Sequence, residues 1–219
     1  MGIRSIILQP LAHFKSTHIE KDSYRAIENQ TKILHSLTRK ARKTVYGKEK
    51  GFDKINNYAD FVKKVPLVDY EKLKPYIQRI IDGEKDILWP GLPIYFAKTS
   101  GTTSGSKHIP ISKESIHNHI DTARNALLMY AYRTKNYAFA DHYMIFVQGS
   151  PELDTSGIIP TGRLSGIVAH HVPAYLKKKR MPSWRTNCIE DWESKIDAIV
   201  AETLKKPMSL ISGIPSWLR

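Results

Sequence analysis

The sequence predicts an α/β fold in which a mainly helical segment, residues 1–90, precedes the start of a mixed or parallel β-sheet within residues 91–219. Three observations support this fold class. Capping residues and apolar residues three or four positions apart recur up to about residue 83. The pattern then changes at Pro90-Gly91-Leu92-Pro93. After this point short apolar strands alternate with helical patterns, which is typical of α/β sheets.

Helix signals define the elements of the first segment. Asp22 or Ser23 is expected to cap a helix that ends at Gly47. Its apolar face is expected to hold Ile27, Thr31, Leu34, Leu37, Ala41 and Val45. Asn57 is expected to cap a short helix with Tyr58, Phe61, Val62 and Val65. Asp69 and Pro75 open further turns that end at Gly83 and bury Leu73, Ile77, Ile80 and Ile81.

Strands and helices alternate in the second segment. Strands are predicted at 94–97, 108–111, 143–147 and 208–211, with a weaker one at 167–169. Ser112 is expected to cap a long helix that points Ile116, Ile120, Ala123, Leu127 and Tyr130 inward. A last helix, stopped by Pro207, is marked by Trp192, Ile196, Ile199, Val200 and Leu204.

Composition bounds the class of protein. Hydrophobic residues make up 41% and charged residues 25% of the 219 residues, as in ordinary soluble globular proteins. No apolar run approaches the roughly 20 residues that span a bilayer, so we expect no membrane partner. Because Cys188 is the single cysteine, no intrachain disulfide can form and a cytoplasmic location is expected. We expect Cys188 to be a small, partly buried residue rather than a nucleophile.

The formal net charge of +13 raises the question of nucleic-acid binding. The 34 Lys and Arg residues are spread along the chain, and no nucleic-acid module signature accompanies them. The densest run, Lys177-Lys178-Lys179-Arg180, is expected to lie in a solvated loop. We therefore expect no nucleic-acid partner, and an anionic small substrate such as ATP accounts for part of the excess equally well.

A hydroxyl-rich loop at residues 99–107 follows the first predicted strand and is suited to polyphosphate. Glycines let the backbone turn tightly and approach oxygen atoms. Successive backbone N–H groups can form an anion-binding nest, and Lys107 adds a point charge. The alternative is a solvated Ser/Gly loop, which composition alone supports equally. The candidate binding residues are Thr99, Ser100, Gly101, Thr102, Thr103, Ser104 and Gly105, with Lys107 as the candidate catalytic residue.

Other catalytic motifs do not fit this chain. A P-loop requires glycine where Ser106 stands and a hydroxyl residue where His108 stands. A nucleophile elbow at Ser100 requires glycine where Lys98 stands. His117 and His119 are two apart on a predicted helix and cannot chelate together. Without a His-Glu-x-x-His motif or a cysteine cluster, no protein-ligated metal is predicted, and His170-His171 is expected to be a structural pair rather than a pocket lining.

The order Thr99-Ser100-Gly101-Thr102-Thr103, followed by Lys107, resembles the first signature of the adenylate-forming superfamily, although Ser104 stands where glycine is usual. This superfamily includes acyl-CoA synthetases, luciferases and peptide-synthetase adenylation domains. The flanking stretches are similar to the auxin-responsive-promoter family of acyl-acid amido synthetases. These stretches are residues 65–71, 74–77, 91–93, 162–166 and 212–217.

The resemblance implies the N-terminal domain of a two-step ligase that uses ATP and Mg²⁺. ATP and a carboxylic acid give an acyl-adenylate and pyrophosphate, and an amine, expected to be an amino acid, then takes the acyl group. Two alternatives stay open: an acyl-CoA ligase or other adenylate-former, and a non-catalytic basic module that binds anions or nucleic acid. Plant members use an Arg on the helix after the loop to meet the acid's carboxylate. Here Ala126 aligns with that Arg, and Arg124 is two positions away.

The resemblance places the adenine, ribose and magnesium contacts in later motifs, and a small C-terminal domain follows them. None of these has a counterpart in residues 1–219. We therefore expect this chain to be part of a truncated adenylate-forming domain that is inactive alone. Its expected partners are an acid, an amine and the remainder of its own chain, or else further copies of itself. Self-association would involve the apolar residues Ile211, Trp217 and Leu218.

Overall fold

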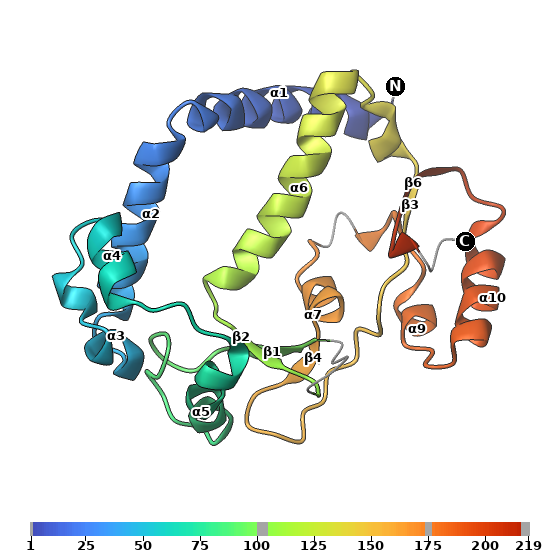
Figure 1. The fold of residues 1–219 in the computed structure, drawn as a ribbon. Coiled ribbons are helices and arrows are strands. Elements are labelled where there is room, and N and C mark those ends of the chain that lie inside the picture. The colour runs from blue at the N-terminus through green and yellow to red at the C-terminus, as the bar shows by residue number, and fades with distance from the viewer. Residues whose placement is uncertain (1, 100–104, 174–176, 216–219) are drawn as a thin grey trace. The chain divides into compact units, whose positions relative to one another are not determined.

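The computed structural model describes residues 2–99, 105–173 and 177–215. The chain divides into two compact units (Figure 1). Unit 1 comprises Met1–Ile19, Ile116–Leu153 and Gly162–Arg219, and unit 2 comprises Glu20–Ser115 and Asp154–Thr161. The described residues form helices and two three-stranded sheets, so the predicted α/β class is confirmed.

Helix α1 (Ile3–Ser23) occupies a segment where the sequence showed only a short apolar patch. Its buried residues are Ser5, Ala12 and Ser16, all of them small. The large apolar residues Ile3 and Phe14 are 77% and 64% exposed. Because the buried face is made of small residues, apolar periodicity could not reveal this helix.

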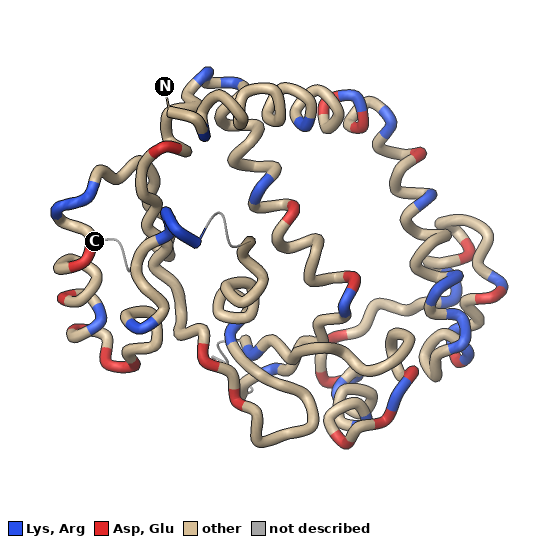
Figure 2. The backbone as a smooth tube through the Cα atoms, turned by 180° about the vertical axis from the view of Figure 1, so that it is seen from behind, with Lys and Arg blue, Asp and Glu red and all other residues tan. Residues whose placement is uncertain are grey.

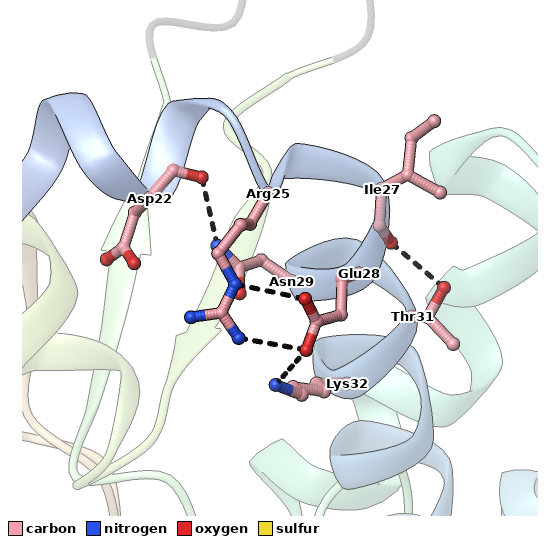
Figure 3. Close-up of polar contacts among 7 residues, drawn as sticks. All are labelled: Asp22, Arg25, Ile27, Glu28, Asn29, Thr31 and Lys32. Atoms are coloured by element: carbon pink, nitrogen blue, oxygen red, sulfur yellow. Dashed lines mark hydrogen bonds and ion pairs between the residues drawn. The ribbon is translucent and has the colours of Figure 1, made fainter.

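The chain turns at Tyr24 and Arg25 before helix α2 (Ala26–Ala41), and Figure 3 shows the polar contacts of this turn. The expected cap by Asp22 or Ser23 is wrong, because α1 runs through both residues. Instead the Asp22 carbonyl accepts from the Arg25 N–H at 3.0 Å and from the Asn29 side-chain amide at 3.1 Å. Arg25 in turn donates two hydrogen bonds to the Glu28 carboxylate, which also receives Lys32.

Helix α2 ends at Ala41, six residues before the predicted end at Gly47. Thr44 caps a new helix, α3 (Val45–Glu49), by accepting from the Gly47 N–H, so Gly47 lies inside α3. The predicted apolar face of α2 is also wrong in part. Ile27 is 83% exposed, whereas the buried residues of α2 are Thr38 and Ala41.

The two helix caps predicted further along are confirmed. After the 3₁₀ turn η1 (Phe52–Lys54), Asn57 caps α4 (Tyr58–Lys64) and Asp69 caps α5 (Tyr70–Ile81). Helix α5 buries Ile77 and Ile80 against a core cluster with Ile87, Phe96 and Ile159. Gly83 ends the segment with φ +91°, a left-handed conformation that glycine adopts without steric cost. Tyr58 and Val62 of α4 are exposed, contrary to expectation.

The sheet of unit 2 begins with an antiparallel pair. Strand β1 (Tyr95–Lys98) pairs with β2 (His108–Ile111), so that Tyr95 faces Ile111 and Lys98 faces His108. The sheet order is β2-β1-β4, where β4 (Thr161–Arg163) begins at the last residue of this unit. Both predicted strands that flank the hydroxyl-rich loop are therefore confirmed.

The helix predicted after this hairpin is α6 (Ser115–Thr134). Ser112 accepts from the Ser115 N–H at 3.0 Å, and the Ser115 hydroxyl accepts from the Ser112 N–H at 2.9 Å, which is the geometry of a capping box. The buried residues of α6 are Ile116, Leu128 and Ala131. Ala123 and Tyr130, expected to point inward, are exposed.

Unit 1 holds a parallel sheet of order β5-β3-β6. Its strands are β3 (Tyr143–Phe146), which follows the 3₁₀ turn η2 (Ala138–Asp141), β5 (Arg180–Met181) and β6 (Met208–Ser212). The short helix α9 (Trp184–Asn187) and the predicted last helix, α10 (Trp192–Thr203), precede β6. Ile145, Val147, Met181 and Ile199 form one core cluster.

Two sequence-based expectations in unit 1 are corrected. Residues 167–169 form part of a helix, α7 (Leu164–His170), rather than a strand. Gly166 lets this helix approach the chain after β3, because an added Cβ would overlap the Ser150 carbonyl oxygen. The run 177–180 is only partly a solvated loop, since Arg180 belongs to β5 with its guanidinium 5.1 Å from the Phe146 ring centre. Among the described residues, no helix has the length and apolar character needed to cross a membrane.

Candidate functional site

The candidate phosphate loop connects β1 to β2. Five of its residues, Ser100, Gly101, Thr102, Thr103 and Ser104, lie outside the described residues. Thr99, Gly105, Ser106 and Lys107 are described, and they fix both ends of the loop.

Thr99 and Lys107 close the base of the loop as an extra rung of the hairpin. The Thr99 N–H donates to the Lys107 carbonyl at 3.1 Å, and the Lys107 N–H donates to the Thr99 hydroxyl at 3.3 Å. The Ser106 hydroxyl donates to the Thr99 carbonyl at 3.3 Å. Because the Thr99 hydroxyl accepts here, its proton stays available to donate to a ligand.

The backbone conformation at Gly105 requires a glycine at the second end of the loop. Its φ is +80°, a left-handed conformation that other residues rarely adopt. An added Cβ at Gly105 would meet no heavy atom within 4 Å. The backbone dihedral, rather than crowding, therefore requires glycine, and the space beside this exposed backbone is open to an approaching anion.

Lys107 is half-buried. Its ammonium nitrogen lies 5.4 Å from the ring centre of Tyr70 on α5, within the range of a cation–π contact. The ring restricts where the ammonium group can lie. Because the contact already restricts the rotamers of Lys107, this side chain loses less conformational entropy when it binds an anion.

Tyr70 is the site residue that sequence reasoning missed. Its hydroxyl accepts from the His108 N–H at 2.9 Å and lies 3.4 Å from the His108 carbonyl. It thereby holds the start of β2 against the first turn of α5. Its place directly after the Asp69 cap was visible in the sequence, but a contact across 38 residues was not.

His108 and Lys98 face each other across the hairpin, next to the loop. His108 packs edge-on against Phe96, and burial, followed by the charge of Lys98, lowers the pKa of its imidazole. Lys98 lies 3.4 Å from Asp154. A neutral imidazole and a neutralised lysine leave Lys107 as the cation best placed to meet an anion in the loop.

The arrangement suits electrostatic binding of phosphate oxygens rather than proton transfer. The described donors of the loop are the Thr99 hydroxyl, the backbone near Gly105 and the Lys107 ammonium group. Within residues 2–99, 105–173 and 177–215, no three His, Cys, Asp or Glu side chains gather as they would around a metal ion.

Other candidate residues have structural partners. His170 Nε2 lies 2.7 Å from the Pro151 carbonyl, and its ring packs edge-on against Trp184. Cys188 is half-buried, and burial raises the pKa of its thiol, as expected of a non-nucleophilic residue. Arg124 forms a 2.9 Å ion pair with Asp121 on the same helix.

Comparison with known proteins identifies relatives. Residues 15–204 match the model of the GH3 family N-terminal domain. The chain is 31% identical over 118 residues to the indole-3-acetic acid-amido synthetase GH3.3 of Arabidopsis thaliana, covering 50% of this chain and 20% of that protein. It is 25% identical over 162 residues to the jasmonoyl-L-amino acid synthetase JAR4 of Nicotiana attenuata, covering 73% of this chain and 27% of that protein.

Solved structures share the fold. The GH3.15 acyl acid amido synthetase matches with a TM-score of 0.61 at 17% identity, over 90% of this chain and 34% of that chain. A complex of the AtGH3.15 acyl acid amido synthetase with 2,4-DB gives a TM-score of 0.62 at 19% identity, over 77% of this chain and 30% of that chain. The matched region thus corresponds to about a third or less of each relative's length.

Proposed function

The chain belongs to the GH3 family, and from this membership we propose that the complete protein is an ATP-dependent acyl-acid amido synthetase. The names of its relatives describe synthesis of an amide of a carboxylic acid, or of its conjugate with an amino acid. The proposed reaction activates an acid as its acyl-adenylate, with release of pyrophosphate. An amine, in this proposal an amino acid, then attacks the acyl carbon and releases AMP.

The β1–β2 loop is the observation on which the proposal depends. A loop closed by Thr99 and Lys107, with the Lys107 ammonium held over Tyr70, supplies fixed donors for the β- and γ-phosphates. Neutralising these phosphates makes pyrophosphate a better leaving group when the carboxylate attacks the α-phosphorus. Because Lys107 is partly ordered before binding, less of its interaction energy is lost to immobilising it.

Mg²⁺ is part of the proposal as an ion that would neutralise the negative charge of the phosphates. The described residues near the loop offer hydroxyl, amide and ammonium groups, which suit the phosphates, and Asp154 is engaged by Lys98. We therefore propose that the protein ligand of Mg²⁺ comes from a family motif outside these residues.

The test compares Lys107→Ala with Lys113→Ala, an exposed lysine that follows β2. Both variants remove one positive charge from the complete protein. We expect Lys107→Ala to lower acid-dependent ATP–pyrophosphate exchange at least about tenfold, since one charge-assisted contact is lost, and to leave the circular dichroism spectrum unchanged. Lys113→Ala should keep full exchange. Equal exchange by the two variants would remove Lys107 from the site.

An acyl-CoA ligase shares the first step and differs in the acceptor. Mixing the enzyme-bound acyl-adenylate with a panel of amino acids and with coenzyme A separates the two functions. We expect amide products with one or a few amino acids and no thioester. A thioester as the sole product would assign the protein to the acyl-CoA ligases.

A further inference from the structure

A basic hollow in unit 2, apart from the β1–β2 loop, is not used by the proposed reaction. It forms where α2 ends and α3 and η1 begin, and its volume is about 470 Å³. Figure 2 shows Lys and Arg positions gathered at this corner of the chain. Four cationic side chains and one carboxylate line the hollow, together with a glycine: Arg42, Lys43, Lys48, Gly51, Asp53 and Lys54.

The backbone under this hollow is firmly held. The buried Thr44 hydroxyl donates to the Ala41 carbonyl at 2.7 Å and accepts from the Gly47 N–H at 3.0 Å. A Cβ on Gly47 would overlap the Ala41 carbonyl oxygen, so glycine permits the close approach of α3 to the end of α2. The cationic side chains therefore extend from a fixed frame rather than from a loose loop.

Gly51 turns the chain from α3 into η1 with φ +61°. A Cβ built on Gly51 would lie 3.8 Å from the ammonium nitrogen of Lys64, which comes from α4. A fifth cation thus stands at the edge of the hollow.

Several cations of the same unit are paired with carboxylates, whereas the cations of the hollow are not. Arg25 and Lys32 bind Glu28, Arg79 binds Glu84, and Lys98 binds Asp154. Among the described residues, Arg42, Lys43, Lys48 and Lys54 form no ion pair with a carboxylate.

Carboxylates offset this charge only in part. Glu49 and Asp60 are not among the residues that line the hollow. Asp53 is the single carboxylate that lines the hollow. Uncompensated cations that surround one concave space raise the local concentration of anions.

A purely structural role accounts for only part of the cluster. Basic residues near the C-terminal end of α2 interact favourably with the helix dipole, which explains Arg42 and Lys43. Lys48, Lys54 and Lys64 come from three other elements, and that effect fades beyond the last turn of a helix. Their convergence on the same hollow needs a different reason.

We propose that this hollow binds a short inorganic polyphosphate chain such as pyrophosphate or tripolyphosphate. Arg42 offers a planar fork that matches two phosphate oxygens, and the lysines offer point charges that adapt to a chain of several phosphates. The anion is compact rather than a nucleic acid, because the residues that line the hollow include no aromatic side chain that could stack on a base. This site goes beyond the proposed ligase reaction and does not depend on it.

The test measures binding of sodium pyrophosphate and sodium tripolyphosphate to the complete protein by isothermal titration calorimetry at about 0.15 M salt. The site variant is Lys48→Ala/Lys54→Ala. The control variant, Lys177→Ala/Lys178→Ala, removes the same charge from two exposed lysines of the basic run. Lys107→Ala is also added to the site variant and to the control variant. This substitution distinguishes anion binding in the hollow from anion binding by the β1–β2 loop.

We expect tripolyphosphate to bind more tightly than pyrophosphate and orthophosphate to bind weakly. The site variant should weaken tripolyphosphate binding about tenfold or more, since two direct charge contacts are lost. The control variant should bind tripolyphosphate with an affinity within a factor of about two of that of the unchanged protein. Adding Lys107→Ala should leave the difference in affinity between the site variant and the control variant unchanged. Equal weakening in the site and control variants would mean that net charge alone attracts the anion and would overturn the proposal. Abolition of all binding by Lys107→Ala would assign the anion to the loop and would overturn it as well.

Discussion

At the scale of single residues, the anion-binding role of the loop stays a prediction, whereas the strands on either side of it are confirmed. Hydroxyl, glycine and lysine residues in that order indicate anion binding whatever the fold, and Gly105 has the left-handed conformation that such a loop needs. The partner of Lys107 could not be predicted. The position of the Tyr70 ring under the ammonium group depends on how α5 docks on β2, which is a tertiary property that local patterns do not encode.

Glu28 is the residue for which the structure makes the sharpest electrostatic prediction. Hydrogen bonds from Arg25 and then from Lys32 lower the pKa of its carboxyl from 4.5 to about 2 (Figure 3). We expect NMR titration of the Glu28 side chain to show a midpoint near 2 at low salt. Arg25→Ala should move the midpoint toward 4.5, and Lys74→Ala, which removes a lysine paired with Glu71, should not.

The sign of the corresponding pH effect follows from linkage. A carboxyl whose pKa is lower in the folded state contributes stability above about pH 4.5 and loses it as the pH falls toward 2. The contribution is small because Arg25, Glu28 and Lys32 are all exposed to solvent and salt. A midpoint near 4.5 in the unchanged protein would contradict the pairing seen in Figure 3.

At the scale of elements, capping signals predicted better than apolar faces. Asn57, Asp69 and Ser112 each mark a helix start because a side-chain oxygen must meet the free N–H groups there. Burial of side chains did not follow the apolar pattern of the sequence. Helices α1, α2 and α10 bury residues such as Ser16, Thr38 and Lys195, while Ile27 and Phe14 are exposed.

Helix α7 shows why short apolar runs mislead. Ile167 and Val168 favour a strand by local propensity, but tertiary packing overrides so weak a preference. The helix buries Gly166, Ile167 and Ala169, and Gly166 allows the backbone contact with Ser150. Nothing in the local sequence records that contact.

Gly47 provides a prediction about the corner that α2 and α3 form. We expect Gly47→Ala to lower the free energy of unfolding by about 2–3 kcal/mol, because the added methyl group would overlap the Ala41 carbonyl and force the two helices apart. The matched control is Gly157→Ala, where an added Cβ meets nothing within 4 Å. Urea unfolding followed by circular dichroism measures both. A loss below about 0.5 kcal/mol for Gly47→Ala would show that the corner can relax.

At the scale of the whole molecule, the charge distribution separates a small-anion binder from a nucleic-acid binder. Figure 2 shows Lys and Arg along nearly every described element, interspersed with Asp and Glu. Part of this charge is paired within unit 2, and one concentrated group lines a hollow rather than a stripe along a helix. Such a pattern suits compact anions better than a continuous phosphate backbone.

We therefore predict weak binding to nucleic acid despite the net charge of +13. Fluorescence anisotropy with a labelled DNA duplex and a labelled RNA should give dissociation constants weaker than about 1 μM at physiological salt, as for non-specific binders. The Lys177→Ala/Lys178→Ala and Lys48→Ala/Lys54→Ala variants should change this binding equally. Submicromolar binding, or selective loss in one variant, would identify a nucleic-acid interface that the dispersed charge does not predict.

The last prediction concerns what residues 1–219 can do by themselves. Adenylation needs the α-phosphorus of ATP aligned with a carboxylate to within a fraction of an ångström, and it needs Mg²⁺ and the ribose held in place. In our proposal the β1–β2 loop binds only phosphate oxygens, and no metal-binding cluster accompanies it in the described residues.

Through phosphate contacts alone, the loop should bind ATP with a dissociation constant on the order of millimolar, because few atoms make contact and the loop must become ordered. We expect residues 1–219 alone to show no acid-dependent ATP–pyrophosphate exchange beside an active complete protein. We also expect them to self-associate, since Ile3, Ile7, Phe14 and Ile211 expose apolar surface. The state of association is measured by size-exclusion chromatography with light scattering. ATP–pyrophosphate exchange by a monodisperse preparation would show that these residues already contain a complete adenylation site. It would overturn the proposal that other parts of the protein complete the site.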